Sequence, residues 1–468
     1  MGDKEQLMSD ECLESSKNVV RKQPAAKVPW YFANGFLLFW GLLFFAVVIP
    51  RMYKLPQANT MEDAKKGVFI AERAYKNLYH LANIGPKVTG TEENEVQALN
   101  FILKELEAIK AASLQDLFDI EIEVAQSSGA WVRGTYLNMY QGVQNIVVKF
   151  STKNSTSETY LLVNSHFDSG PGSPGAADAG CMVVTMLEVL RVMSTTRQRF
   201  DHPIIFLLNG GEELGLHGGH AFMTTHRYAK YCKAVINLEA AGSGGKEVLF
   251  QSGPRHAWLM KYYKKFAKHP LATAMAEEIY QSGIIPSNTD FTTFSKYMPG
   301  FDFAQFINGY VYHTKYDALD RIPRESLQNT GDNILSIVRG MANATELYDT
   351  AAYKSGTTVF FDFLGLTLVQ YPLATAKNLN FGVAAAAVLL VFISMWRMSS
   401  MSEVTICNVI VRFILVLVLQ LVSFVLSLAL PVAVAYVFDM FGMSLTYYST
   451  PWLMICLYVC PILCSASY

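Results

Sequence analysis

The sequence predicts an α/β fold, in which a mostly parallel mixed sheet carries helices on both faces, with transmembrane helices at both ends of the chain. Only 16% of the 468 residues are charged, whereas soluble domains average about 25%. The uncharged, apolar runs lie near the two chain ends. Between them, short apolar segments alternate with longer helical patterns, which is typical of a parallel sheet covered on both faces.

The charges are balanced, because 38 basic and 39 acidic side chains give a formal net charge of −1. This excludes a nucleic-acid-binding protein that relies on bulk positive charge, so no nucleic-acid partner is expected. Seven cysteines, spread from Cys12 to Cys464, are too few and too scattered for a disulfide scaffold. Cys181 and Cys232 could still pair if the middle of the chain lies in an oxidising compartment.

The first apolar run, residues 30–49, contains no charge and is long enough to cross a bilayer as a helix. A cleaved signal peptide is the alternative, but a long segment precedes the run and no small-residue cleavage site follows it. We therefore expect a cytosolic tail over 1–29 and an uncleaved transmembrane signal anchor over 30–49.

Further apolar segments over 378–396, 413–438 and beyond Met440 predict a multi-helix membrane region over 378–468, truncated within its fourth segment. The loop between the first two contains Arg397 and Arg412, and basic loops are retained in the cytosol. Counting back from this loop places the domain over 57–350 on the lumenal side. Two sequons in that domain are predicted glycosylation sites, Asn154 and Asn343.

The middle domain has a βα pattern. Ligands of open α/β sheets bind beyond the carboxyl ends of the strands, so the chemistry is expected there. We predict strands over 160–165, 203–208, 234–238 and 248–251, helices over 61–84 and 181–193, and an added strand pair at an edge over 136–150.

The predicted strand ends carry side chains that could bind metal. One such His or Glu alone is more often structural or solvated, but a series at successive strand ends predicts a site. Five of them are nitrogen and oxygen donors that suit zinc, namely His166, Asp178, Glu213, Glu239 and His313.

Five ligands can serve two ions if one carboxylate bridges them, because each ion then has the bridge, one His and one further carboxylate. Glu212 precedes a ligand and could take a proton from water. Asp168, two residues after His166, could orient that imidazole through its other ring nitrogen.

Six motifs stand out between residues 165 and 317, namely SHFDS at 165–169, PGAAD at 174–178, NGGEELGLHGG at 209–219, INLEAAGSGGKEVLFQSGP at 236–254, SGIIPSNTDF at 282–291 and NGYVYHTKYD at 308–317. Together they resemble the co-catalytic dinuclear zinc aminopeptidases, a family that includes glutamate carboxypeptidase II and the degenerate transferrin receptor ectodomain. The longer motifs and the apolar chain ends resemble the endoplasmic reticulum metallopeptidase branch.

This resemblance implies the zinc exopeptidase fold and two zinc ions per domain. It implies that Asp178 bridges the ions and that Glu212 is the general base, with Asp290 and Tyr312 in the substrate pocket. Ala179 departs from the family, which usually has Asp or Asn there, so Asp178 is expected to be less firmly held.

The leading hypothesis is a membrane-anchored zinc exopeptidase, an aminopeptidase that acts on peptide or protein substrates. It would be a multi-pass protein of the endoplasmic reticulum membrane with a lumenal catalytic domain. A receptor or scaffold that keeps the peptidase fold without activity is the alternative. A transporter is disfavoured because the apolar cores contain no acidic or basic residue.

Overall fold

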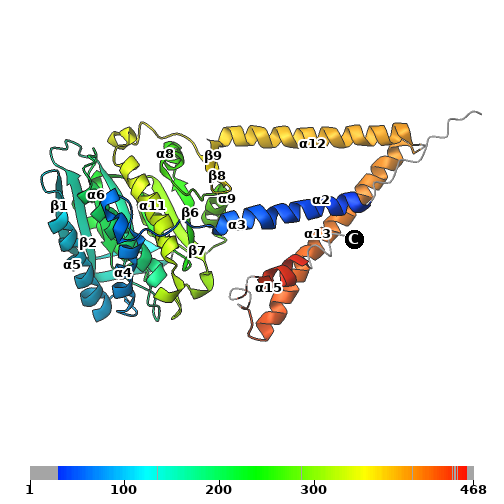
Figure 1. Ribbon diagram of the computed structural model, residues 1–468. Helices are drawn as coiled ribbons and strands as arrows, with labels where there is room; N and C mark the ends of the chain where they lie inside the picture. The colour runs from blue at the N-terminus through cyan, green and yellow to red at the C-terminus, as the bar shows by residue number, and fades with distance from the viewer. Residues whose placement is uncertain are drawn as a thin grey trace, which may run out of the picture. The chain divides into compact units, whose positions relative to one another are not determined.

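The computed structural model describes residues 30–460 except 134, 286, 403, 445, 447–449 and 451. The predicted cytosolic tail therefore lies outside the described residues. The chain divides into two compact units (Figure 1). The larger is Ala46–Ala376, and the smaller consists of the described parts of Met1–Phe45 and Lys377–Tyr468.

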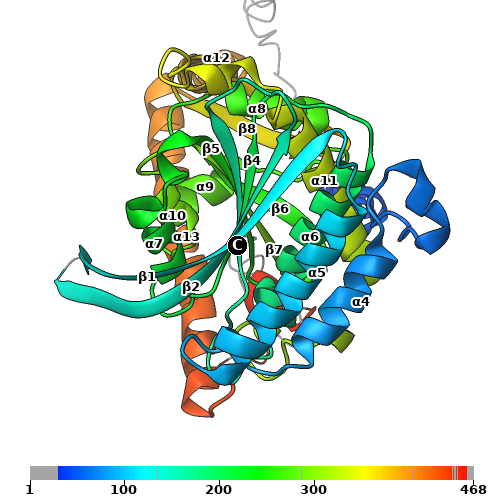
Figure 2. The same cartoon turned by 90° about the vertical axis from the view of Figure 1, so that its left-hand side faces the viewer.

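The larger unit contains a seven-stranded sheet in the order β1-β2-β4-β3-β5-β7-β6 (Figure 2). Strands β4, β3, β5 and β7 run parallel to one another, while β1, β2 and β6 are antiparallel to their neighbours. The predicted mixed sheet with a parallel centre is thus confirmed. The strands are β1 (Phe118–Arg133), β2 (Tyr136–Thr152), β3 (Tyr160–His166), β4 (Ile204–Asn209), β5 (Cys232–Ala240), β6 (Gly244–Gly253) and β7 (Gly300–Ile307).

The central strands are apolar on both faces, so each face needs a cover. On one face, Leu161 and Val163 of β3 join the main core, which α4 (Ala71–Ala82), α5 (Leu99–Ala112), α6 (Met182–Thr195), α8 (Trp258–Phe266) and α11 (Arg324–Met341) help to build. On the other, Leu162 packs with Phe222 and Phe294, which belong to α7 (His217–Thr225) and α10 (Phe291–Phe294). Helices therefore cover both faces, as predicted.

Two predicted elements differ from the structure. The expected helix over 61–84 is interrupted, because Gly67 has a left-handed backbone (φ 65°) that ends the short helix η2 (Met61–Lys66) before α4 begins. The expected strand pair over 136–150 is a single strand, β2, whose partner is β1. Further short helices of this unit are η3 (Glu93–Ala98), η4 (Ala176–Cys181), η5 (Ala229–Tyr231), α9 (Ala274–Gln281), η6 (Gly309–Val311), η7 (Leu319–Arg321) and η8 (Thr345–Tyr348).

A separate two-stranded hairpin closes the larger unit. It consists of β8 (Thr358–Phe363) and β9 (Thr367–Pro372), which pair antiparallel. The helix α12 (Leu373–Met401) follows β9 without a linker. The unit therefore extends past the predicted end of the domain at residue 350.

Three helices of the described part of the chain are long and apolar enough to cross a membrane: Asn34–Tyr53, Leu373–Met401 and Ile406–Met440. The second and third contain the predicted runs 378–396 and 413–438, and the first overlaps the predicted run 30–49 from residue 34 on. Part of the predicted fourth segment, 461–468, lies outside the described residues. The helical elements involved are α2 (Trp30–Leu43), η1 (Phe44–Val48), α3 (Ile49–Tyr53), α12 and α13 (Ile406–Met440), and α15 (Trp452–Met454) and η9 (Ile455–Val459) follow them.

Candidate metal centre

The predicted ligands lie together at the carboxyl ends of the parallel strands β3, β4 and β5. His166 is the last residue of β3, and Glu239 is the penultimate residue of β5. Glu213 follows the end of β4 in the same loop as Glu212. Because parallel strands end at a common edge, residues far apart in sequence meet there.

Two groups of ligand atoms share Asp178. His166 Nε2 lies 3.3 Å from Asp178 Oδ1 and 3.2 Å from Glu239 Oε2. His313 Nε2 lies 3.1 Å from Asp178 Oδ2 and 2.9 Å from Glu213 Oε2. Within each group the ligand atoms lie within 4.8 Å of one another. The structure thus brings together all five predicted ligands and places one Asp178 oxygen in each group.

The donor set fits divalent cations. His166 Nε2 and Glu213 Oε1 are buried and have no hydrogen-bond partner in the protein. Burial opposes the charged form of each imidazole, yet Glu239 and other carboxylates raise the pKa of His166 well above its usual value. Asp178 and Glu213 raise the pKa of His313 to about 10. Three carboxylates thus concentrate negative charge that zinc ions would neutralise.

Asp168 holds the loop that carries the Glu pair. The backbone N–H of Glu212 donates to both Asp168 carboxylate oxygens at 3.0 Å, and that of Glu213 donates to Oδ2 at 3.1 Å. Nδ1 of His166 lies 3.0 Å from the backbone oxygen of Asp168 and 3.4 Å from its carboxylate. The predicted orientation of His166 therefore depends more on the Asp168 backbone than on its carboxylate.

Glu212 is held beside these groups without being part of either. Burial raises its pKa well above the usual value, although His166 opposes the rise. Its backbone is fixed by Asp168. A carboxyl that holds its proton more tightly than usual can accept one near neutral pH.

Asp317 supports the shared ligand and was missed from the sequence. It is fully buried, and its carboxylate accepts hydrogen bonds from the backbone N–H groups of Ala177 (2.7 Å) and Asp178 (3.1 Å). The peptide bond between Asp178 and Ala179 is cis, and Ala179 is buried. The position of Asp317, four residues after His313 in the same motif, was the only available signal. Asp317 thus holds the backbone that carries the shared ligand Asp178.

Lys87 was missed as well. Its side chain is buried, and Nζ donates to the backbone oxygens of Gly85 (3.3 Å) and Pro174. Burial lowers its pKa to about 8, against the attraction of Asp317 and nearby carboxylates. The ammonium group therefore lies close to an acidic cluster and ties together the loops around it.

Residues 145–338 match the model of peptidase family M28. This range runs from β2 into α11 and contains the five candidate ligands and Glu212. We call this matched range the M28 domain.

The chain is also similar to known proteins. The chain is 38% identical over 398 residues to endoplasmic reticulum metallopeptidase 1 of Mus musculus, covering 84% of this chain and 44% of the relative. It is 38% identical over 426 residues to the protein of that name from Homo sapiens, covering 89% and 46%. The chain thus spans less than half the length of these relatives. A solved zinc aminopeptidase from Bacillus subtilis, BSAP, aligns with TM-score 0.44 and 16% identity over 62% of this chain and 98% of its own.

The two predicted pocket residues of the M28 domain differ in their placement. Tyr312 is half-buried, and its ring stacks on His313 at 3.8 Å between centroids. Burial, followed by Asp178 and Glu213, raises the pKa of its hydroxyl. Asp290 is instead fully buried and accepts hydrogen bonds from Asn164 (2.9 Å) and Asn209 (2.5 Å). Its carboxylate connects the ends of β3 and β4, and its predicted place in the substrate pocket stays a prediction.

Two predicted glycosylation sites and one possible cysteine pair also lie in the larger unit. Asn154 and Asn343 are both exposed, as a glycosylation site must be. Cys181 and Cys232 are buried and free. Their Sγ atoms lie 3.0 Å from Ala177 O and 3.5 Å from Tyr228 O, respectively, so the disulfide considered from the sequence is not formed.

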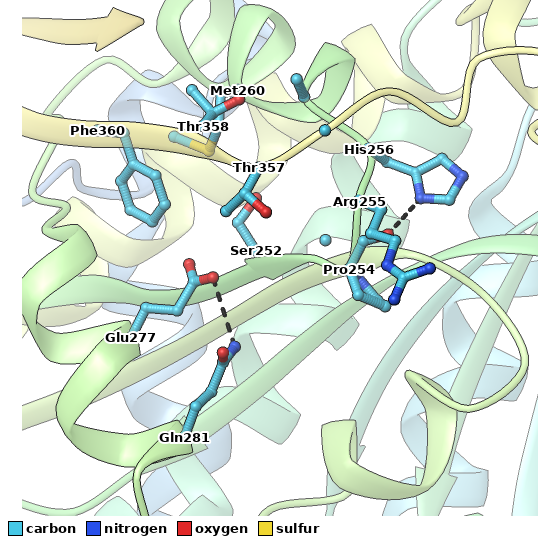
Figure 3. Close-up of a pocket in the computed structure, with 13 residues that line it drawn as sticks. Ser252, Pro254, Arg255, His256, Met260, Glu277, Gln281, Thr357, Thr358 and Phe360 are labelled. Atoms are coloured by element: carbon cyan, nitrogen blue, oxygen red, sulfur yellow. Dashed lines mark hydrogen bonds between the residues drawn. The ribbon is translucent and has the colours of Figure 1, made fainter. Parts of the chain in front are cut away.

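A separate cavity of about 200 Å³ lies where β6 ends, between that strand, α9 and β8 (Figure 3). Gly253 at this end pairs with Gly300 at the start of β7. The cavity therefore lies at the amino ends of the parallel strands, whereas the metal centre lies at their carboxyl ends. Glu277 lines it, with Oε1 accepting from Gln281 at 3.4 Å and Oε2 unpartnered. Burial raises the pKa of Glu277 to about 7.

Proposed function

We propose that the chain is a membrane-anchored zinc metallopeptidase, an aminopeptidase that hydrolyses peptide bonds at a dinuclear site. The observation that carries this proposal is Asp178, whose two carboxylate oxygens each belong to a different three-ligand group. The M28 family match supports the peptidase chemistry.

The two groups would hold one zinc ion each. His166 and Glu239 would complete one set, and His313 and Glu213 the other, with Asp178 common to both. When bound, such ions polarise a peptide carbonyl and acidify water. The three carboxylates offset three of the four charges of two zinc ions, and the remaining positive charge favours an electron-rich oxygen in the site.

The residues beside the ligands supply proton transfer and orientation. Glu212 would accept a proton from the attacking water and deliver it to the leaving amine. The Asp168 carboxylate keeps Glu212 in place by accepting hydrogen bonds from the backbone N–H of Glu212. The Tyr312 hydroxyl stays protonated next to the acidic groups, so it can donate a hydrogen bond to the oxygen that becomes negative during attack.

Glu212 also distinguishes the enzyme hypothesis from the alternative hypothesis of a scaffold that keeps the peptidase fold without activity. A scaffold has no need of a base beside a complete set of ligands. The test uses the purified full chain and two variants, Glu212→Gln and the exposed control Glu278→Gln. We expect two zinc ions per chain in all three proteins, and loss of aminoacyl-reporter hydrolysis only in Glu212→Gln. Wild-type protein that binds no zinc, or full activity of Glu212→Gln, would overturn the proposal.

The direction of cleavage is tested with blocked substrates. The aminopeptidase assignment rests on the motif resemblance, and an aminopeptidase requires a free α-amino group. We expect peptides with an acetylated amino terminus to resist hydrolysis and peptides with an amidated carboxyl terminus to be cleaved. The reverse preference would make the enzyme a carboxypeptidase and leave the zinc chemistry intact.

We further propose a multi-pass location in the endoplasmic reticulum membrane with the M28 domain in the lumen. The names of the relatives, the three apolar helices and the arginines in the 397–412 loop support it. Lumenal sequons receive glycans, so Asn154→Gln and Asn343→Gln should each remove one glycosidase-sensitive mobility shift. Unmodified wild-type protein in membranes would contradict this orientation.

A further inference from the structure

The hairpin of β8 and β9 has an inner face that belongs to the core of the larger unit. Phe360 and Leu368 are both buried there. The Asp362 carboxylate accepts hydrogen bonds from the backbone N–H groups of Gly365 (2.8 Å) and Ala272 (3.3 Å). The hairpin is therefore a fixed part of the unit and presents a defined opposite face.

That opposite face is apolar although it is exposed. Phe361 and Phe363 alternate with the inward-facing residues of β8 and are 38% and 57% exposed. Leu366, at the turn, is 59% exposed. Val369 lies opposite Phe361 on β9. A strand pair with one face in water normally alternates apolar and polar residues, so this outer hairpin face, defined by Phe361, Phe363 and Leu366, requires a cover.

The base of the hairpin adjoins one candidate membrane span. β9 ends at Pro372, and the apolar helix α12 begins at the next residue. The backbone N–H of Leu373 donates to Thr357 O at 3.0 Å, which fixes the first residue of this helix to the segment before β8. The outer hairpin face is thus joined to the start of the span without a flexible linker.

The tip of the hairpin lies near the residues at which the N-terminal candidate span ends. A Cβ atom on Gly365 would lie 3.1 Å from Lys246 Nζ. Nζ itself donates to the backbone oxygen of Arg51 at 3.1 Å, and Arg51 lies in the candidate span Asn34–Tyr53. Tyr53 and Lys54 are exposed at this point. Aromatic and basic side chains are typical of membrane–water interfaces.

We propose that the outer hairpin face rests in the interfacial layer of the membrane, where its side chains contact phospholipid between the headgroups and the acyl chains. Its two ends adjoin the two points at which the chain passes from the larger unit into an apolar helix, so a bilayer that holds both helices meets the hairpin between them. This inference rests on the membrane anchoring in the proposed function. The contact would hold the M28 domain against the lipid surface.

Lipid crosslinking in phosphatidylcholine nanodiscs tests the proposal on the full chain. A photoreactive benzoyl-phenylalanine replaces Phe363, the matched control Tyr348, which is 56% exposed in the same unit, or Phe39, which is 60% exposed within the N-terminal span. We expect lipid adducts by mass spectrometry at 363 and 39, with at least a tenfold lower yield at 348.

Each other outcome overturns the inference and shows where the reasoning fails. If position 39 labels but 363 labels no more than 348, the hairpin faces water while the anchoring survives. A crosslink from 363 to a second copy of the chain makes the face a dimer contact. If 39 fails to label, the span itself is wrong, and the hairpin proposal fails with it. Zinc content of each variant reports whether the M28 domain is intact.

Discussion

Asp317 is the residue through which the fold fixes the shared ligand, and Asp317→Asn is the sharpest test of that arrangement. Its two carboxylate oxygens accept one N–H each, from Ala177 and Asp178. An asparagine of the same shape keeps one acceptor but turns an NH₂ group toward the other N–H. One charge-assisted hydrogen bond is lost, and two donors then face each other in a site without solvent.

The magnitude follows from that loss. A hydrogen bond to a charged group contributes about 1.5–3 kcal/mol. If the lost hydrogen bond makes the metal-binding position of Asp178 less favourable by about 2 kcal/mol, zinc affinity falls about 30-fold, because each 1.4 kcal/mol changes an affinity about tenfold. This lies within the roughly 10–100-fold range for residues that orient metal ligands.

Zinc affinity is measured by competition with a chromogenic chelator, in parallel with hydrolysis of an aminoacyl reporter. Asp320→Asn is the control, because Asp320 is exposed and three residues away. We expect weaker zinc binding and recovery of activity at high zinc for Asp317→Asn alone. Wild-type affinity in Asp317→Asn would refute the role assigned to this carboxylate, and lost activity without weaker zinc binding would move that role to the substrate.

Three further predictions concern stability, measured as the midpoint of thermal unfolding. The pKa of Glu277 is raised to about 7 in the fold, so its ionisation destabilises the native state as pH rises from about 4.5 through 7, by on the order of 3 kcal/mol. Glu277→Gln should therefore stabilise the protein at pH 8 and have little effect at pH 5, and an equal effect at both would contradict the assignment. A Cβ on Gly331 would lie 2.3 Å from the Phe69 ring, so Gly331→Ala should destabilise by about 1–3 kcal/mol. Gly356→Ala, which meets no atom within 4 Å, should not. Chelation should lower the midpoint and added zinc should restore it, since ligands that bind only the folded state stabilise it; an unchanged midpoint would argue against a bound metal.

The candidate ligands could be predicted because the sequence itself marks strand ends. His166 and Glu239 each close a short apolar run, and a parallel sheet brings such ends together. The shared position of Asp178 could not be obtained from spacing, and only the family resemblance implied it. It depends on the segment after β3 turning back toward His313, which follows β7 far along the chain.

The missed residues depend on contacts between distant parts of the chain. Asp317 meets residues about 140 positions earlier, and no local pattern distinguishes it from a solvated carboxylate. Strand β1 is a different case. Phe118, Ile120 and Ile122 alternate with acidic residues, which is the period of a half-buried strand. That signal was present in the sequence and would have predicted the edge hairpin.

The acidity of the metal centre links metal binding to folding of the larger unit. Asp168, Asp178, Glu213 and Glu239 gather around two imidazoles, and Lys87 is the buried cation nearby. Protons on His166 and His313 offset part of this charge. Metal ligands must be deprotonated to bind, so zinc and protons compete for the same nitrogen atoms. Zinc affinity should therefore fall as pH drops, and acid should release the metal before it unfolds the strands that hold the ligands.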